Sequence, residues 1–203
     1  MAQAPQNIQT ENFLNSEVIC DEFFISIVEN KLKVSRDQFK LRLVLLCPAA
    51  GKNENFTSAI FRVKIMIQHS DGRKESVQAI VKALVEIVPT FQDLGVFPRE
   101  RKMYDGVIKS FQKIWEEVGV KVNFGPKSIQ FETDPYEIIV LDDLSEGGYI
   151  MPDRKIGVDL NVARLLIEKL AKFQAASAIR FEIVRDHRIF YILDFYTLNS
   201  RME

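Results

Sequence analysis

The sequence predicts an α+β fold, in which an antiparallel sheet is combined with helices and is followed by a helical segment. Two kinds of pattern lead to this prediction. Apolar and polar residues alternate along residues 58–68, and the turn at residues 70–73 contains Asp-Gly, which suits a tight hairpin. Two long segments, residues 98–119 and 159–177, instead repeat their apolar residues at helical spacing.

The elements of the first half follow from the same patterns. After a loose polar tail at residues 1–12, apolar spacing predicts a helix from Phe13 to about Lys33. A strand is expected from Phe39 to Pro48 and a turn over residues 49–55. Residues 77–88 are expected to form the strand that follows the hairpin.

In the second half, Pro98 suits the first turn of a helix that Gly119 can end. Two strands are expected at residues 127–133 and 137–141. Asp159 can cap the second long helix, which we expect to be buried in the core of its lobe. Its predicted inward-facing residues are Val162, Leu165, Leu166, Leu170 and Phe173.

The composition is that of a globular chain without a nucleic-acid partner. The 203 residues are 47% hydrophobic and 27% charged, and the formal net charge is −1. No long basic block is present, which argues against nucleic-acid binding. No stretch is apolar over a membrane-spanning length and no signal peptide is recognised, so we expect no membrane partner and a cytoplasmic location.

The most informative single residue is Lys82, which lies within the apolar run of residues 79–85. This run predicts a strand that is covered on both faces. Burying an unpaired ammonium costs roughly several kcal/mol, so Lys82 needs an anionic partner or ligand. The alternative is a lysine that extends from an edge strand to water.

Glu100 is the candidate partner of Lys82. It precedes Met103 and Tyr104 by three and four residues, which places its carboxylate on the apolar face of the predicted helix. The alternative is an acid of the first turn that interacts with the helix dipole. A strand lysine paired with a helix glutamate is the arrangement that kinases use to hold ATP phosphates.

Five stretches, in this order, carry a resemblance to a known family. They are Asn53–Arg62, Ile80–Lys82, Phe97–Tyr104, Val140–Leu144 with Gly148 and Arg154, and Leu170–Ser177. Over most of its length the chain resembles the insect ecdysteroid kinase-like family, also called the CHK kinase-like group, which is related to choline and aminoglycoside kinases.

The resemblance implies a protein-kinase-like organisation of the chain. An N-terminal lobe of antiparallel sheet plus helix would span residues 13–141, and a hinge or connector would span residues 142–148. The beginning of a helical C-terminal lobe would follow at residues 149–182, before a divergent tail at residues 183–203.

The resemblance also implies roles for individual residues. Lys82 and Glu100 would form the ion pair at the ATP phosphates. The loop over the phosphates would be Asn53, Glu54, Asn55, Phe56, Thr57 and Ser58. The hinge, whose backbone groups would bind adenine, would be Val140, Leu141, Asp142 and Asp143. The family uses ATP and Mg²⁺ to phosphorylate small-molecule alcohols, including steroids, so the implied partners are a nucleotide and such an alcohol.

The chain departs from the family pattern at several places. Asn53 stands where the family has glycine, and Gln174 stands where it has histidine. No His-Gly-Asp-x-Trp-x-x-Asn run occurs in the sequence, and Leu193–Tyr196 follows the preceding helix too closely to be the family's metal motif. We therefore assign no catalytic residue and no metal ligand, and expect a truncated member that carries the nucleotide-binding half. The alternative is a non-catalytic, pseudokinase-like nucleotide-binding or interaction module.

The missing run leads to the first prediction. Phosphoryl transfer needs an aspartate near the acceptor hydroxyl and ligands for the metal. Incubating the chain with ATP, Mg²⁺ and a hydroxylated steroid should therefore give no more phosphorylated product than a Lys82→Ala control. Product that depends on Lys82 would contradict this prediction.

Overall fold

The computed structural model describes residues 13–49, 58–84, 95–134, 136–153 and 155–184. The chain divides into two compact units. The first unit comprises the described residues up to Asp105 together with Pro126–Ile150. The second unit comprises Gly106–Gly125 and the described residues from Met151 onward.

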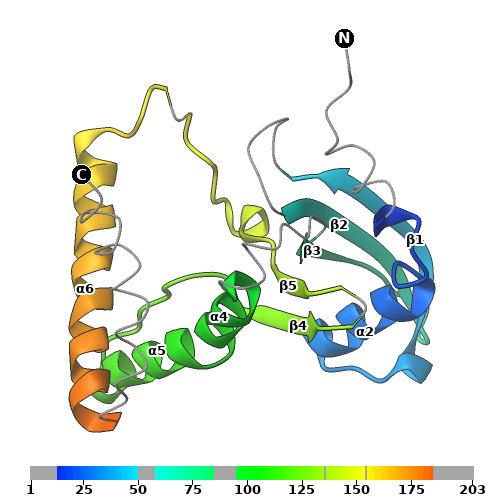
Figure 1. Ribbon diagram of the computed structural model, residues 1–203. Helices are drawn as coiled ribbons and strands as arrows, with labels where there is room; N and C mark the ends of the chain where they lie inside the picture. The colour runs from blue at the N-terminus through cyan, green and yellow to red at the C-terminus, as the bar shows by residue number, and fades with distance from the viewer. Residues whose placement is uncertain (1–12, 50–57, 85–94, 135, 154, 185–203) are drawn as a thin grey trace. The chain divides into compact units, whose positions relative to one another are not determined.

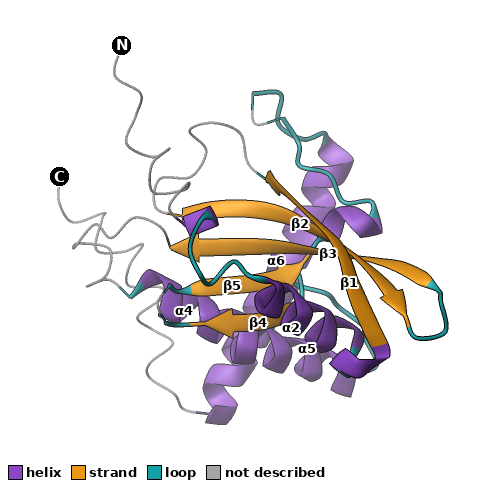
Figure 2. Cartoon of the chain, turned by 90° about the vertical axis from the view of Figure 1, so that its right-hand side faces the viewer, coloured by secondary structure: helices purple, strands orange, loops and turns teal. Residues whose placement is uncertain are grey.

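The first unit is built on a five-stranded antiparallel sheet with the strand order β1-β2-β3-β5-β4, which Figure 2 shows in orange. Its strands are β1 (Phe39–Pro48), β2 (Ser58–His69), β3 (Lys74–Leu84), β4 (Ser128–Glu132) and β5 (Ile138–Asp142). The strand predicted over residues 39–48 is confirmed. The predicted Asp-Gly hairpin also joins β2 to β3, with Gly72 at a φ of +88°.

One face of this sheet holds the main hydrophobic core. Buried side chains of β2 and β3 pack there with the helix α2 (Asp21–Leu32). The buried residues that α2 contributes are Phe23, Phe24, Ile27 and Val28. Phe13 is fully buried in the same cluster and its ring stacks with that of Phe61. Burial of this apolar surface is the main favourable term in forming the unit.

The helix predicted from Phe13 to about Lys33 is interrupted: Phe13 and Leu14 are helical, residues 15–20 form turns and bends, and α2 begins at Asp21. The amide and the hydroxyl of Ser16 both donate to the Phe13 carbonyl, at 3.1 and 2.6 Å. Such local bonds give the backbone an alternative to the helix. After α2, the short 3-10 helix η1 (Arg36–Gln38) leads into β1.

The burial of the side chains of β3 differs from the prediction. Its burial alternates: Val77, Ala79, Val81 and Ala83 are buried, whereas the residues between them, including Lys82, are partly exposed. The prediction of two covered faces was therefore wrong, because apolar residues on the partly exposed face hid the alternation. The predicted strand extended to Val88, but residues 85–94 lie outside the described residues.

The long helix predicted from Pro98 is divided into three parts. These are α4 (Val96–Lys102), the π-helical segment η2 (Met103–Val107) and α5 (Ile108–Glu117). Pro98 does lie in the first turn, and Gly119 follows the last turn with a φ of +76°. Gly106 lies within η2, and glycine weakens a regular helix.

In the second unit, α5 packs against α6 (Leu160–Val184). The rings of Phe111, Phe124 and Phe173 contact one another edge to face, with centroids 4.9 to 6.4 Å apart. The indole nitrogen of Trp115 donates to the Lys172 carbonyl at 3.0 Å. Asp159 caps α6 as predicted, because its carboxylate accepts from the amides of Asn161 and Val162.

The predicted inward face of α6 is largely exposed. Leu165 is 65% and Leu170 57% exposed, and Val162 and Leu166 are exposed as well, whereas Phe173 is partly buried against Phe111. The expectation of a buried helix is thus wrong for the described part of the chain. Helical spacing shows which residues share a face, but it does not show what covers that face.

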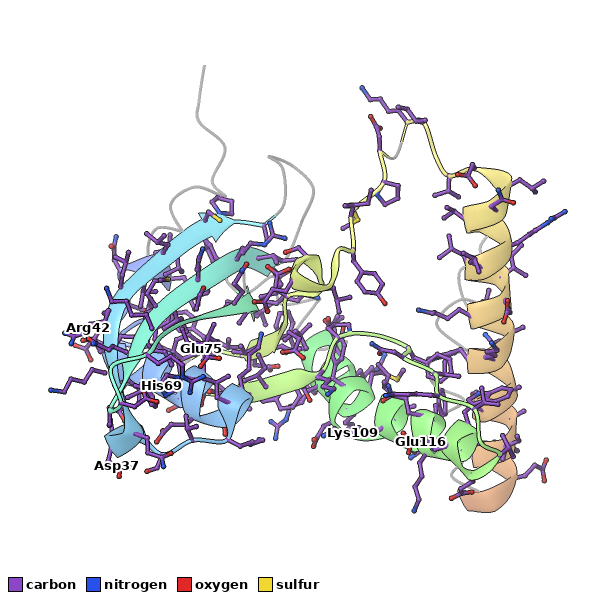
Figure 3. All side chains as sticks on the ribbon, turned by 180° about the vertical axis from the view of Figure 1, so that it is seen from behind. Asp37, Arg42, His69, Glu75, Lys109 and Glu116 are labelled. Carbon is purple, nitrogen blue, oxygen red and sulfur yellow. The ribbon has the colours of Figure 1, made fainter. Side chains whose placement is uncertain are left out.

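The hairpin end of the sheet is polar. His69 and Glu75, labelled in Figure 3, approach to 2.7 Å between the imidazole and the carboxylate. Arg42, also labelled, donates to the side chain of Gln68 on the neighbouring strand.

Among the described helices, none combines the length and the apolar content needed to cross a bilayer.

The burial pattern of the sheet predicts a contrast between two substitutions. Ile65 of β2 is fully buried, whereas Leu45 of β1 is half exposed. Ile65→Ala should lower the free energy of unfolding by about 2–5 kcal/mol because it leaves a cavity. Leu45→Ala should cost less than about 1 kcal/mol. Urea unfolding of both variants checks this, and equal losses would contradict the assignment of faces.

Candidate functional site

The candidate site is centred on an ion pair between β3 and α4. The ammonium of Lys82 lies 2.6 Å from Glu100 Oε2, and the two side chains are 22% and 24% exposed. Lys82 lies opposite Ile60 of β2 and Ile139 of β5, so it projects from the face of the sheet that α2 does not cover. Glu100 lies beyond the first turn of α4, so the pair, not the helix dipole, explains its position.

Aromatic rings surround this pair. The ammonium of Lys82 lies 5.3 Å from the centroid of the Phe97 ring, a distance at which a cation is attracted to the ring face. Phe97 itself is buried against Ile139 and Leu141, which seats α4 on the sheet, as Figure 1 shows. Burial, together with the nearby charge of Glu100, raises the pKa of Tyr104.

The predicted phosphate loop is largely outside the described residues. This holds for Asn53, Glu54, Asn55, Phe56 and Thr57. Ser58, the last residue of the predicted loop, is the first residue of β2 and pairs with Leu84. Ser58 therefore lies on the strand next to the strand that carries Lys82.

Three of the four residues of the predicted hinge lie within a strand. Val140, Leu141 and Asp142 belong to β5, which pairs with β3 on one side and β4 on the other. The Asp142 amide also donates to the Lys127 carbonyl at 2.9 Å. Asp143 is therefore the first of the four residues to lie beyond the strand.

Asp143 is a buried acid with two sets of partners. Its Oδ2 lies 2.5 Å from Arg62 Nε, and its Oδ1 accepts from the Ser145 amide at 3.0 Å. The second bond caps the short helix η3 (Leu144–Gly147). Burial raises the pKa of the Asp143 carboxyl, but the hydrogen bonds from Ser145 and Arg62 outweigh it, so the pKa lies below its ordinary value.

Lys31 of α2 was not singled out from the sequence. Its ammonium donates to the Gln78 carbonyl at 2.6 Å and to Glu146 at 2.8 Å, and it lies 3.4 Å from Asp142. In the sequence, Arg62 stands out only as the last residue of a stretch that resembles the family. For Arg62 a signal existed, since it lies two residues after Ile60 in an alternating strand and so shares the face of Ile60, which lies opposite Lys82.

A cavity of about 370 Å³ lies between α4 and the β4–β5 edge of the sheet. Its lining includes Phe97, Arg101, Glu132 and Ile139, but neither Lys82 nor Glu100. We therefore do not assign the nucleotide to this cavity. Within the described ranges, no three His, Cys, Asp or Glu side chains gather into a group that could hold a metal ion.

The lowered pKa of Asp143 predicts a pH dependence of stability. The charged carboxylate favours the folded state, so its contribution is complete above the ordinary value of 3.8 and is lost as the pH falls through the lowered pKa. The unfolding free energies of the native chain and of Asp143→Asn should therefore differ by a constant amount above about pH 5, and this difference should shrink below about pH 4. Urea unfolding across this range measures the difference, and a difference that stays the same from about pH 6 down to about pH 2.5 would count against the assignment.

One comparison with known proteins identifies a family. A sequence model of the ecdysteroid kinase-like family matches residues 52–197, which include β2, β3, α4 and the connector after β5. No curated protein and no solved structure gives a significant match. The fold is α+β and kinase-like, with an antiparallel N-terminal-lobe sheet followed by the beginning of a helical part. The chain thus belongs to the ecdysteroid kinase-like family, a family of kinase-like phosphotransferases.

Proposed function

We propose that this chain binds ATP through its first unit. Lys82 contacts the phosphates, Glu100 holds Lys82 in place, and backbone groups of the connector that begins at Asp143 bind adenine. The observation that carries this proposal is the ion pair of 2.6 Å between two elements, β3 and α4. In kinases such a pair positions the lysine for phosphate oxygens.

The surroundings of Lys82 support a ligand role over a purely structural one. An ammonium has three donors, and the bond to Glu100 uses one of them. The side chain remains about one-fifth exposed, so an anion can reach it from the open side of the sheet. The pair Arg36–Glu22 provides a contrast, since both of its side chains are more than half exposed and it joins η1 to α2.

The rest of the proposal is supported by the family. We propose ATP with Mg²⁺ as the phosphate donor and a small-molecule alcohol, such as a steroid, as the acceptor, because this is the chemistry that the resemblance implies. The described residues do not gather a metal-binding group, so we assign Mg²⁺ to none of them. We propose the cytoplasm as the compartment, where ATP is available.

The second candidate is a non-catalytic module that binds nucleotide or another protein. The exposed leucines of α6 favour it, because contiguous apolar surface commonly marks a contact surface. Both candidates share the Lys82 site. They differ in what the chain contributes: the first candidate supplies the ATP-binding half of a phosphotransferase, whereas the module takes no part in phosphate transfer.

The proposal predicts that Lys82→Ala weakens binding of Mg-ATP by about 10-fold to 100-fold, which is the usual range for losing a hydrogen bond to a charged group. Lys64→Ala is the matched control, because Lys64 is an exposed lysine on the same face of neighbouring β2 and lies opposite Gln78. Its effect should stay within about twofold. Isothermal titration measures both. Equal affinities of the two variants, or no saturable binding by the native chain, would overturn the proposal.

A further inference from the structure

The side chains of two adjacent acids at the end of β5 lie on opposite faces of the sheet. Asp142 lies opposite Ala79 of β3, and Leu141 lies opposite Ile80. Directly opposed residues share a face, and Ala79 is buried in the core beneath α2. Asp142 therefore lies on the α2 face. Asp143 follows it and reaches the other face, where Arg62 lies opposite Ile80.

On the α2 face, Lys31 joins three parts of the unit. Its ammonium donates to the Gln78 carbonyl of β3 and to Glu146 of η3, and it forms an ion pair with Asp142 of β5 at 3.4 Å. The side chain is four-fifths buried, so these contacts are shielded from bulk water. Lys31 thereby attaches both ends of the segment from Asp142 to Glu146 to the body of the sheet.

On the other face, Arg62 holds Asp143. Its Nε lies 2.5 Å from Oδ2 and its Nη2 lies 3.5 Å from Oδ1, so the guanidinium faces both carboxylate oxygens. The carboxylate is almost completely buried, and the same oxygen Oδ1 also accepts from Ser145. Removing Arg62 would leave a buried charge without its cation, which is far more costly than losing an exposed pair.

We infer that Arg62 and Lys31 are positioning residues, a pair of cations that clamps the end of β5 and the connector Asp143–Gly148 from both faces of the sheet. Arg62 and Lys82 project from the same face of neighbouring strands, so the clamp sets the distance between the connector and the ammonium of Lys82. A nucleotide that spans both places needs them at a constant separation. The part of this inference that concerns adenine rests on the proposed function.

The first experiment tests the clamp without any nucleotide. Amide hydrogen exchange of residues 142–149 is compared in the native chain, Arg62→Gln, Lys31→Gln and Arg36→Gln. The last is the matched control, because it breaks an exposed arginine–carboxylate pair. Exchange in the connector should be faster by about tenfold or more in the first two variants and unchanged in the control.

The second experiment separates positioning from a general loss of structure. Isothermal titration measures Mg-ATP, which carries adenine, and magnesium inorganic triphosphate, which does not. Arg62→Gln should weaken ATP binding by about tenfold and leave triphosphate binding within about twofold. Lys82→Ala should weaken the binding of both ATP and triphosphate. Arg62→Lys keeps the positive charge but loses the planar guanidinium. Its affinity for Mg-ATP should lie between those of the native chain and of Arg62→Gln.

The outcomes are distinguishable. Unchanged exchange in both clamp variants overturns the clamp, and so does an equal loss of ATP and triphosphate in Arg62→Gln. A native chain that binds no ATP overturns the proposed function, while the exchange experiment still decides whether the clamp exists. If Arg62→Gln shows no cooperative melting, Arg62→Lys and Lys31→Gln carry the same comparisons.

Discussion

The register of β3 between β2 and β5 is the constraint on which the candidate site depends. It places Lys82 opposite Ile60 and Ile139, and Arg62 opposite Ile80, so both cations lie on one face. A slip of one residue would turn Lys82 into the core beneath α2 and would bring Val81 out of it. The buried residues of β3 on the α2 face are all apolar, which makes such a slip costly and thereby holds the charged residues in place.

The two faces of the sheet differ in their burial and in their charge. The α2 face is buried and supplies most of the stability of the unit. The other face keeps Lys82 and Arg62 partly exposed, and each is paired with an acid from a different element. A charge on this face avoids the full cost of burial and remains within reach of a ligand. The same division lets α4 and the connector each hold one acid without disturbing the core.

Much of the first unit was predictable, because strands with one buried face reveal themselves by alternation. β1 matched its predicted range, and β2 ended one residue later than predicted. The Lys82–Glu100 pair was predicted as well, since a lysine in an apolar run needs an anion. Arg62 and Lys31 were missed because their acids lie far away in the sequence: Asp143 is 81 residues from Arg62 and Glu146 is 115 residues from Lys31. Helix boundaries were also wrong near Ser16 and Gly106, where local bonding and backbone freedom compete with helical spacing.

By itself, the sequence determined the antiparallel strands and their hairpin, the need of Lys82 for an anionic partner, and the family motifs that run through both. These are local properties, because the periodicity of apolar residues and the cost of burying a charge can be read within one element. The tertiary structure decided which face of β3 is open, where the strand β5 ends and the connector begins, and which cations meet Asp142 and Asp143. These depend on which strands pair and in what register, and contacts between distant segments have no local pattern from which they could be read.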